Sequence, residues 1–302
     1  MLFTNYGLMN PMTKIYGVNS MVAPLKRVVV KRPDQHFAVN DPEKWHYTSK
    51  PNLHQAQKDH DIFTSILKQH GAEVIYHDED QPERADAIFV YDPVFVTPFG
   101  SIILQVGKEL RRGEEEPLGR KLESVGVPIL GKLTGDARAE GGDMFWLDEE
   151  TLVIGIGFRT NAEGVKQIQD ILKPFGVNVL STELPYGDGP IACLHLMSLI
   201  SLIDDDLAVV YPKMMGTAFW QELEHRKFKF IKVSDKEFAS QATNVLTLSP
   251  RKVILPENNP ETKKNLEAEG CQVFTYPCAE LTFKAEGGPT CLTRPVLRVF
   301  DK

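Results

Sequence analysis

The chain alternates between segments with a helical spacing of apolar residues and short runs typical of β-strands. Apolar side chains recur at three- and four-residue intervals over residues 62–67 and 165–175, which predicts helices with one buried face. Runs rich in valine, isoleucine and other β-prone residues stand between such helices. They occupy residues 26–31, 73–76, 87–90, 101–104, 151–154, 178–180, 208–211 and 252–255. This pattern predicts an α/β protein.

A motif that joins a helix to a strand recurs along the chain. Its form is Leu-x3-Gly-x2-[Val/Ile], and its glycine suits the left-handed conformation that ends a helix. The copies are Leu67-Gly71-Val74, Leu122-Gly126-Ile129, Leu172-Gly176-Val179 and Leu266-Gly270-Val273, with a degenerate copy at Leu223-Lys227-Phe230. Successive leucines lie 55, 50, 51 and 43 residues apart. The spacing predicts five units, each with one helix and two or three strands.

Five units that cannot bury their helices alone indicate closure into a ring. WD40 and kelch repeats have similar periods, but their all-β blades leave the helices unexplained. No linker or low-complexity tract divides the chain, so residues 1–302 are predicted to form a single domain. Residues 1 to about 20 carry little pattern and are expected to form a loose or covering arm.

Composition narrows the class of protein. The net charge of −7 and the lack of a Lys/Arg stripe argue against a nucleic-acid partner. The fractions of apolar residues (42%) and charged residues (25%) are ordinary for a globular protein. The longest nearly uncharged apolar run, residues 191–203, is too short to cross a bilayer. Without a secretion pattern at the N-terminus, and with four cysteines in no disulfide or metal spacing, a cytoplasmic protein with reduced thiols is expected.

Three segments interrupt apolar runs with glycine and chemically active side chains. Glu140 precedes a Gly pair, which marks a bulge or a close backbone approach, so its carboxylate is expected at a strand end facing the interior or mouth of the ring. His195 stands between apolar residues, and Cys291 follows Gly-Gly-Pro-Thr on a turn. Each residue also has an alternative without a catalytic role. Glu140 would lie in a solvent-exposed turn, His195 would be a core histidine whose hydrogen bonds are satisfied, and Cys291 would be an unreactive buried thiol. The remaining cysteines stand in plain apolar contexts and are assigned to the core: Cys193, Cys271 and Cys278.

A cysteine, a histidine and a glutamate on three repeats can converge in a ring, where they supply a nucleophile, a general acid/base and a carboxylate. At these residues the sequence resembles the guanidino-group modifying enzymes of the pentein fold, closest to the dimethylarginine dimethylaminohydrolases, with arginine deiminases and amidinotransferases as relatives. The shared motifs are Glu-Gly-Gly-Asp at 140–143, His-Leu at 195–196 and Gly-Gly-Pro-Thr-Cys-Leu-Thr-Arg-Pro at 287–295. The resemblance runs from about residue 25 to residue 300 and implies a five-bladed α/β propeller.

The resemblance also implies which acidic and aromatic side chains bind substrate. Residues 85–92 are similar to a dimethylaminohydrolase segment whose last carboxylate grips the guanidinium. That carboxylate is Asp92 in this sequence, and the resemblance places Asp86 and Phe89 beside it.

Basic residues at two further motifs are implied to bind a substrate carboxylate. Arg159 begins an Arg-Thr-Asn motif similar to the one that serves this purpose in the family. Residues 110–114 resemble a second basic site for the same carboxylate. Arg112 is preferred for this role, and Arg111 stays open as the alternative.

Two positions depart from parts of the superfamily. Deiminases and amidinotransferases place an aspartate two residues after the catalytic histidine, where the two-residue period of a strand returns to the same face. That position is Met197 here, which favours the dimethylaminohydrolases, and this flexible apolar side chain is predicted to pack against N-methyl groups of the substrate. Tyr91 stands where those enzymes have a glutamate, so the substrate within the class stays open.

The activity that the resemblance implies is hydrolysis of the guanidino group of arginine or an N-methylated arginine. Cys291 would form a covalent thiouronium intermediate, with His195 and Glu140 as the other catalytic residues, and the products would be citrulline and an amine or ammonia. A nucleophile and proton transfers suffice for this chemistry, so no metal and no organic cofactor are expected. An amidinotransferase and a non-catalytic pentein binding module are the alternatives. The expected partner is a small guanidine compound, with a homodimer as the assembly considered.

Overall fold

The computed structural model describes residues 14–300, which form five three-stranded sheets with the same order of strands. In each sheet an inner strand pairs antiparallel with a middle strand, and the middle strand pairs parallel with an outer strand. From inner to outer, the sheets are β15(Arg294–Arg298)-β1(Leu25–Val30)-β2(Glu73–Tyr76), β3(Val94–Thr97)-β4(Gly100–Ile103)-β5(Ile129–Lys132), β6(Met144–Trp146)-β7(Thr151–Ile156)-β8(Asn178–Glu183), β9(Ile200–Asp204)-β10(Leu207–Val210)-β11(Lys229–Lys232) and β12(Leu246–Ser249)-β13(Lys252–Pro256)-β14(Gln272–Tyr276).

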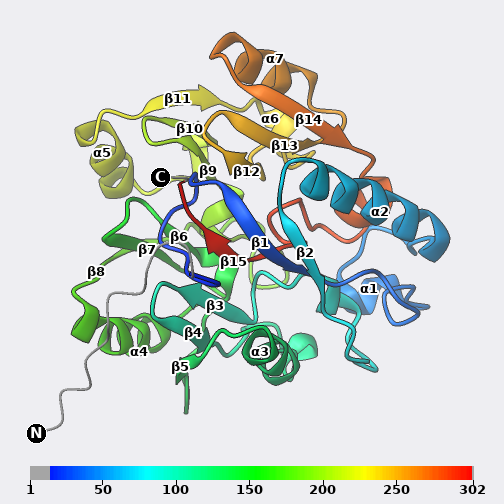
Figure 1. Ribbon diagram of the computed structural model, residues 1–302. Helices are drawn as coiled ribbons and strands as arrows, with labels where there is room; N and C mark the ends of the chain where they lie inside the picture. The colour runs from blue at the N-terminus through cyan, green and yellow to red at the C-terminus, as the bar shows by residue number, and fades with distance from the viewer. Residues whose placement is uncertain (1–13, 301–302) are drawn as a thin grey trace, which may run out of the picture.

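A helix connects the middle strand of each sheet to the outer strand, as parallel strands require. These helices lie around the outside of the molecule in Figure 1. They are α2(Leu53–Gln69), α3(Glu115–Ser124), α4(Ala162–Leu172), α5(Thr217–His225) and α7(Pro260–Ala268), and two single-turn helices are α1(Pro42–Trp45) and α6(Asp235–Phe238). Within residues 14–300, no helix combines the length and the apolar character that a bilayer-spanning segment needs.

The five sheets form the ring that the repeat predicts, and the two ends of the described chain close it. β15 is the inner strand of the first blade, although β1 and β2 come from the opposite end of the chain. The register pairs Leu25 with Arg298 and Val29 with Arg294. Buried Arg298 strengthens this closure because its guanidinium donates to the carbonyl oxygens of Ala23 and Thr247. The five-bladed α/β architecture is therefore confirmed.

The described part of the predicted N-terminal arm lies along the closing strand. The amide of Gly17 donates to Val296 O at 2.7 Å, and the amide of Arg298 donates back to Gly17 O at 3.0 Å. Val18 is buried in the core. Residues 1–13 of the predicted arm lie outside the described residues.

The repeated helix-ending motif adopts the backbone conformation predicted for it. The four motif glycines have φ between 76° and 94°: Gly71, Gly126, Gly176 and Gly270. The degenerate copy follows the same path with a non-glycine residue, since Lys227 has φ 63°. The fold therefore requires a left-handed residue after each helix, and glycine occupies this position in four of the five repeats.

The strand predicted over residues 87–90 is wrong. The chain forms a 3-10 helix over Ala85–Ile88, and the first strand of this blade begins only at Val94. The apolar side chains of this segment are buried on all sides. Periodicity alone does not distinguish such a fully buried short run from a strand.

The motif glycines generate a test of the left-handed turn. Gly176→Ala should lower the free energy of unfolding by about 1–2 kcal/mol, because a positive φ is unfavourable for an L-residue. The new Cβ would make no packing contact that offsets this cost. The added Cβ would meet no described atom within 4 Å, so steric overlap does not contribute. Lys227→Gly is the matched opposite and should raise thermal stability. Equal melting temperatures for both variants and the wild type would contradict the assignment.

Candidate active site

Each inner strand of the five blades is preceded by one polar or nucleophilic side chain. These residues stand two to five positions before β3, β6, β9, β12 and β15, and they are Asp92, Glu140, His195, Asn244 and Cys291. The inner strands surround the axis of the ring, so their leading loops meet at one end of it. Asp92, His195 and Cys291 line a cavity of about 40 Å³ there, and Glu140 and Asn244 hydrogen-bond to its walls.

Glu140 and His195 form a buried, charged pair. Glu140 Oε2 lies 2.6 Å from His195 Nε2, and Oε1 accepts from the amides of Gly107 and Lys108 at 2.8 and 3.0 Å. Burial alone would raise the pKa of Glu140, but the His195 hydrogen bond and the nearby cations hold it below its usual range. Burial would lower the pKa of His195, but the surrounding Cys193 sulfur and carboxylates raise it well above its ordinary value. The pair is therefore an imidazolium bound to a carboxylate.

Asp92 is held between a guanidinium and a backbone amide. Arg111 Nη1 donates to Asp92 Oδ2 at 2.6 Å, and the amide of Gly142 donates to Oδ1 at 2.8 Å. A Cβ at Gly142 would lie 2.4 Å from His195 Nδ1, and one at Gly141 would lie 2.0 Å from the carbonyl oxygen of Tyr91. The Gly pair therefore permits the close backbone approach expected from the sequence.

Cys291 is a neutral thiol in this arrangement. Burial and the adjacent Asp92 carboxylate raise its pKa to about 11. Two contacts act in the opposite direction: Asn244 Nδ2 donates to Sγ at 3.3 Å, and the His195 charge favours the thiolate. Asn244 also accepts the amide of Thr290 at 3.0 Å, which fixes the turn that carries the cysteine. The thiol ionises readily only when further positive charge enters the cavity.

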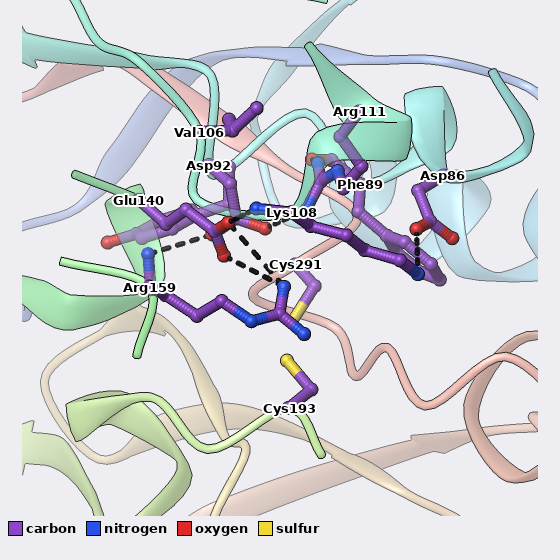
Figure 2. A network of polar contacts seen from close by, with 12 residues as sticks. Asp86, Phe89, Asp92, Val106, Lys108, Arg111, Glu140, Arg159, Cys193 and Cys291 are labelled. Atoms are coloured by element: carbon purple, nitrogen blue, oxygen red, sulfur yellow. Dashed lines mark hydrogen bonds and ion pairs between the residues drawn. The ribbon is translucent and has the colours of Figure 1, made fainter. Parts of the chain in front are cut away.

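Cys193 does not lie in the core, contrary to the prediction. It is exposed and lines the same cavity as Cys291, with its sulfur 3.7 Å from His195 Nδ1. Figure 2 shows the Cys193 and Cys291 sulfurs both beside the end of the Arg159 side chain. The sequence context of Cys193 is apolar, but the chain before His195 forms an irregular loop in which Ile191 and Cys193 are exposed. Cys271 and Cys278 are buried as predicted.

The structure places Arg111 in the site and leaves Arg112 outside it. Arg111 is buried and donates to Asp92, to Glu114 and to the carbonyl oxygen of Phe89. The side chain of Arg112 is 53% exposed, lies 3.7 Å from Glu109, and lines a separate surface groove of about 540 Å³. The 3-10 helix that ends at Arg111 turns successive side chains in different directions. The preference for Arg112 is therefore corrected.

Met197 is also placed away from the cavity. It is 5% exposed and packs in the core beside Tyr91, with which it lines an internal void of about 10 Å³. The prediction assumed that a strand follows His195, but residues 196–198 form a 3-10 turn. The two-residue period does not hold there. Tyr91 likewise points into the core, where its ring stacks 3.9 Å from the guanidinium of Arg294.

The remaining predicted binding residues, Asp86, Phe89 and Arg159, do line the cavity. Arg159 is 5% exposed, and its Nη1 lies 3.4 Å from Glu140 Oε2. The ring of Phe89 packs against Gly287, where a Cβ would approach it to 1.9 Å. Asp86 accepts from Lys108 Nζ at 2.6 Å and from Tyr47 Oη at 2.7 Å.

Besides Cys193, the sequence analysis missed Asn244 and Lys108. Asn244 could have been found from the repeat, because the five residues that precede the inner strands lie 47 to 55 positions apart. Lys108 carries no such signal, since its contact with Asp86 depends on the path of the loop after β4.

Asp92, Glu140 and His195 bring ligand atoms within 4.8 Å of one another. A metal ion would need the lone pair of an imidazole nitrogen, whereas His195 Nε2 already lies 2.6 Å from Glu140 Oε2. The two carboxylates suit a planar cation that donates several hydrogen bonds, as a guanidinium does.

The fold is that of the pentein enzymes. The chain is similar to dimethylarginine dimethylaminohydrolase from Pseudomonas aeruginosa, whose structure holds citrulline, with a TM-score of 0.75 and 23% identity over 90% of this chain and 99% of that one. It is also similar to an amidinotransferase from Microseira wollei, with a TM-score of 0.73 and 15% identity. That match covers 94% of this chain and 98% of the amidinotransferase chain. These likenesses show the pentein fold, and its five blades place a cysteine, a histidine and two carboxylates at one axis.

Within this class, the chain belongs to the dimethylarginine dimethylaminohydrolase family, because the model of N,N-dimethylarginine dimethylhydrolases of the eukaryotic type matches residues 33–298. The chain is 25% identical over 247 residues to the N(G),N(G)-dimethylarginine dimethylaminohydrolase of Pseudomonas aeruginosa, which covers 82% of this chain and 91% of that protein. It is 22% identical over 405 residues to the arginine deiminase of Treponema denticola, and the match covers 94% of this chain and 98% of that protein.

The raised pKa of Cys291 predicts how the thiol reacts. Alkylation by neutral iodoacetamide should be slow near neutral pH and should accelerate as the pH rises towards about 11, since the thiolate is the nucleophile. A cationic haloacetamidine should react faster at neutral pH, because it brings a positive charge beside Asp92. Peptide mass spectrometry measures the label, and Cys291→Ser distinguishes labelling of Cys193. A rate for iodoacetamide that is flat from about pH 6 to pH 9 would contradict the neutral thiol.

Proposed function

We propose that the protein is an amidine hydrolase that cleaves the guanidino group of a small molecule through a covalent adduct on Cys291. The observation that carries the proposal is the cavity at the axis of the ring. There the partly buried Cys291 thiol lies with Asp92 and with the Glu140–His195 pair. Relatives named for this chemistry act on arginine and dimethylarginine.

Two carboxylates hold the planar cation in this mechanism. Asp92 and Glu140 accept hydrogen bonds from the guanidinium nitrogens, which fixes the central carbon near the sulfur. The positive charge of the substrate offsets the Asp92 carboxylate, which after burial is the largest cause that raises the pKa of Cys291. Binding therefore lowers the pKa of the nucleophile at the moment when it is needed.

Cys291 then attacks the central carbon, and the amine leaves. Nε2 of the imidazolium is engaged by Glu140, so the proton for the departing amine comes from Nδ1 of His195. The neutral imidazole takes a proton from water, which attacks the thiouronium carbon and releases the ureido product with the thiolate. Glu140 keeps the imidazole oriented through both steps. A nucleophile and proton transfers complete the reaction.

The next question is whether the enzyme prefers a substrate with methylated guanidino nitrogens. Met197 lies in the core and provides no contact for N-methyl groups. We therefore propose guanidino hydrolysis as the activity without a preference for methylated nitrogen.

The proposal is tested by Cys291→Ser, which should abolish turnover and retain substrate binding, because a hydroxyl is far less ionised than a thiol. Wild type and variant are incubated with arginine, monomethylarginine and dimethylarginine, with and without an acceptor amine, and products are identified by mass. Cys271→Ser is the matched control, since that cysteine lies outside the cavity. Labelling of Cys291 without turnover of any guanidine would favour a binding module, and an amine-dependent product would favour an amidinotransferase.

Arg159→Ala should weaken substrates that carry a carboxylate and leave agmatine, which has none, almost unchanged. Losing a buried arginine–carboxylate contact costs about 2–5 kcal/mol. The measurement is the ratio of kcat/KM for arginine and agmatine in wild type and variant. Equal losses for the two compounds would show that Arg159 does not hold a carboxylate.

We also propose a cytoplasmic location and a homodimer. The location is supported by the lack of any cysteine pair at disulfide spacing in the sequence. Analytical ultracentrifugation tests the assembly, with twice the chain mass of 34.0 kDa expected for a dimer.

A further inference from the structure

A lysine of the chain covers one of the carboxylates that line the cavity. Lys108 Nζ lies 2.6 Å from Asp86 Oδ2 and 2.8 Å from the carbonyl oxygen of Trp45, with the Trp45 ring 5.6 Å away. The Lys108 side chain is 11% exposed and that of Asp86 is 4% exposed. Figure 2 shows the Lys108 side chain crossing the cavity wall to reach Asp86. This ion pair is therefore a partly buried part of the cavity wall.

The pair removes Asp86 as a partner for a positively charged ligand group. One oxygen of Asp86 accepts from Lys108, and the other accepts from Tyr47 Oη at 2.7 Å. A ligand ammonium that approached Asp86 would meet the Lys108 ammonium, and like charges repel strongly where water is scarce. Lys108 therefore already neutralises the Asp86 carboxylate in this part of the cavity.

The same part of the cavity offers positive charge to an anion. Arg159 and Lys108 both line it, and the one acceptor within hydrogen-bond range of the Arg159 guanidinium among the described residues is Glu140, at 3.4 to 3.5 Å. His46 is kept neutral, because burial and the charges of Lys108 and Arg159 lower its pKa. Two further acids, Glu286 and Asp188, stand at the rim, and both side chains are exposed. Burial raises the pKa of Glu286, although Lys108 and Arg159 act in the opposite direction.

We propose that the substrate is a guanidino carboxylate without an α-ammonium group, and that Lys108 is the residue that sets this preference. The inference rests on the proposed function and specifies its substrate class. The guanidinium lies on Asp92 and Glu140, the carboxylate faces Lys108 and Arg159, and Asp86 holds Lys108 in place.

Four compounds of matched length separate the two charges. Arginine carries both the ammonium and the carboxylate, 5-guanidinopentanoate carries only the carboxylate, agmatine carries only the ammonium, and butylguanidine carries neither. In the wild type, kcat/KM for 5-guanidinopentanoate should exceed that for arginine by about tenfold or more, and agmatine should fall below butylguanidine. Arginine equal to or better than 5-guanidinopentanoate would overturn the inference.

Lys108→Met tests the residue itself. It removes the ammonium at similar side-chain length and frees Asp86, so the preference should reverse and arginine should exceed 5-guanidinopentanoate. Lys166→Met is the matched control, because Lys166 pairs with Asp170 on the surface, and it should leave the ratio unchanged. An unchanged ratio in Lys108→Met would overturn the role of Lys108, and the wild-type ranking stands as a test even where this variant does not fold.

Binding to the Cys291→Ser protein separates this inference from the proposed function. Calorimetry on that variant measures the same four affinities without turnover. Hydrolysis by the wild type with arginine preferred refutes the inference alone. A binding preference for 5-guanidinopentanoate without hydrolysis by the wild type refutes the proposed function alone. Failure of all four compounds to bind refutes both.

Discussion

Pairing of the last strand with the first is the constraint on which the rest of the structure depends. β15 completes the first blade by its antiparallel contact with β1, so residues far apart in the sequence share one sheet. Cys291 stands three residues before β15 and reaches the axis only when that strand is in place. Closure of the ring and assembly of the site are therefore coupled, because the thiol meets Asp92 and His195 through this pairing.

Burial then sets the charge state of each group at the axis. Glu140 and His195 stay charged because each offers the other a short contact away from water. Cys291 stays neutral, because it is buried beside a carboxylate. A guanidinium that binds Asp92 changes this balance in favour of the thiolate. Substrate binding and activation of the nucleophile therefore favour each other.

The loop after β4 controls the charge of the cavity wall. It supplies two cations that each cover a carboxylate: Arg111 lies on Asp92, and Lys108 lies on Asp86. The loop also donates two backbone amides to Glu140. One connection between a strand and a helix thus touches three carboxylates around the axis, so small changes in its sequence can alter which ligand charges fit while the catalytic groups stay in place.

The sequence by itself determined the number of blades, because a left-handed turn ends each of the five helices and glycine, which adopts that turn without strain, marks four of them. It also singled out Glu140 and Cys291 as candidates, since a Gly pair stands near each, and His195, since it interrupts an apolar run. Only the tertiary structure decided the directions of Arg111 and Met197, because both lie in 3-10 turns where the period of a strand does not apply. It also decided the contacts of Lys108 and Asn244, because their partners lie on other segments and meet them only when the blades close around one axis.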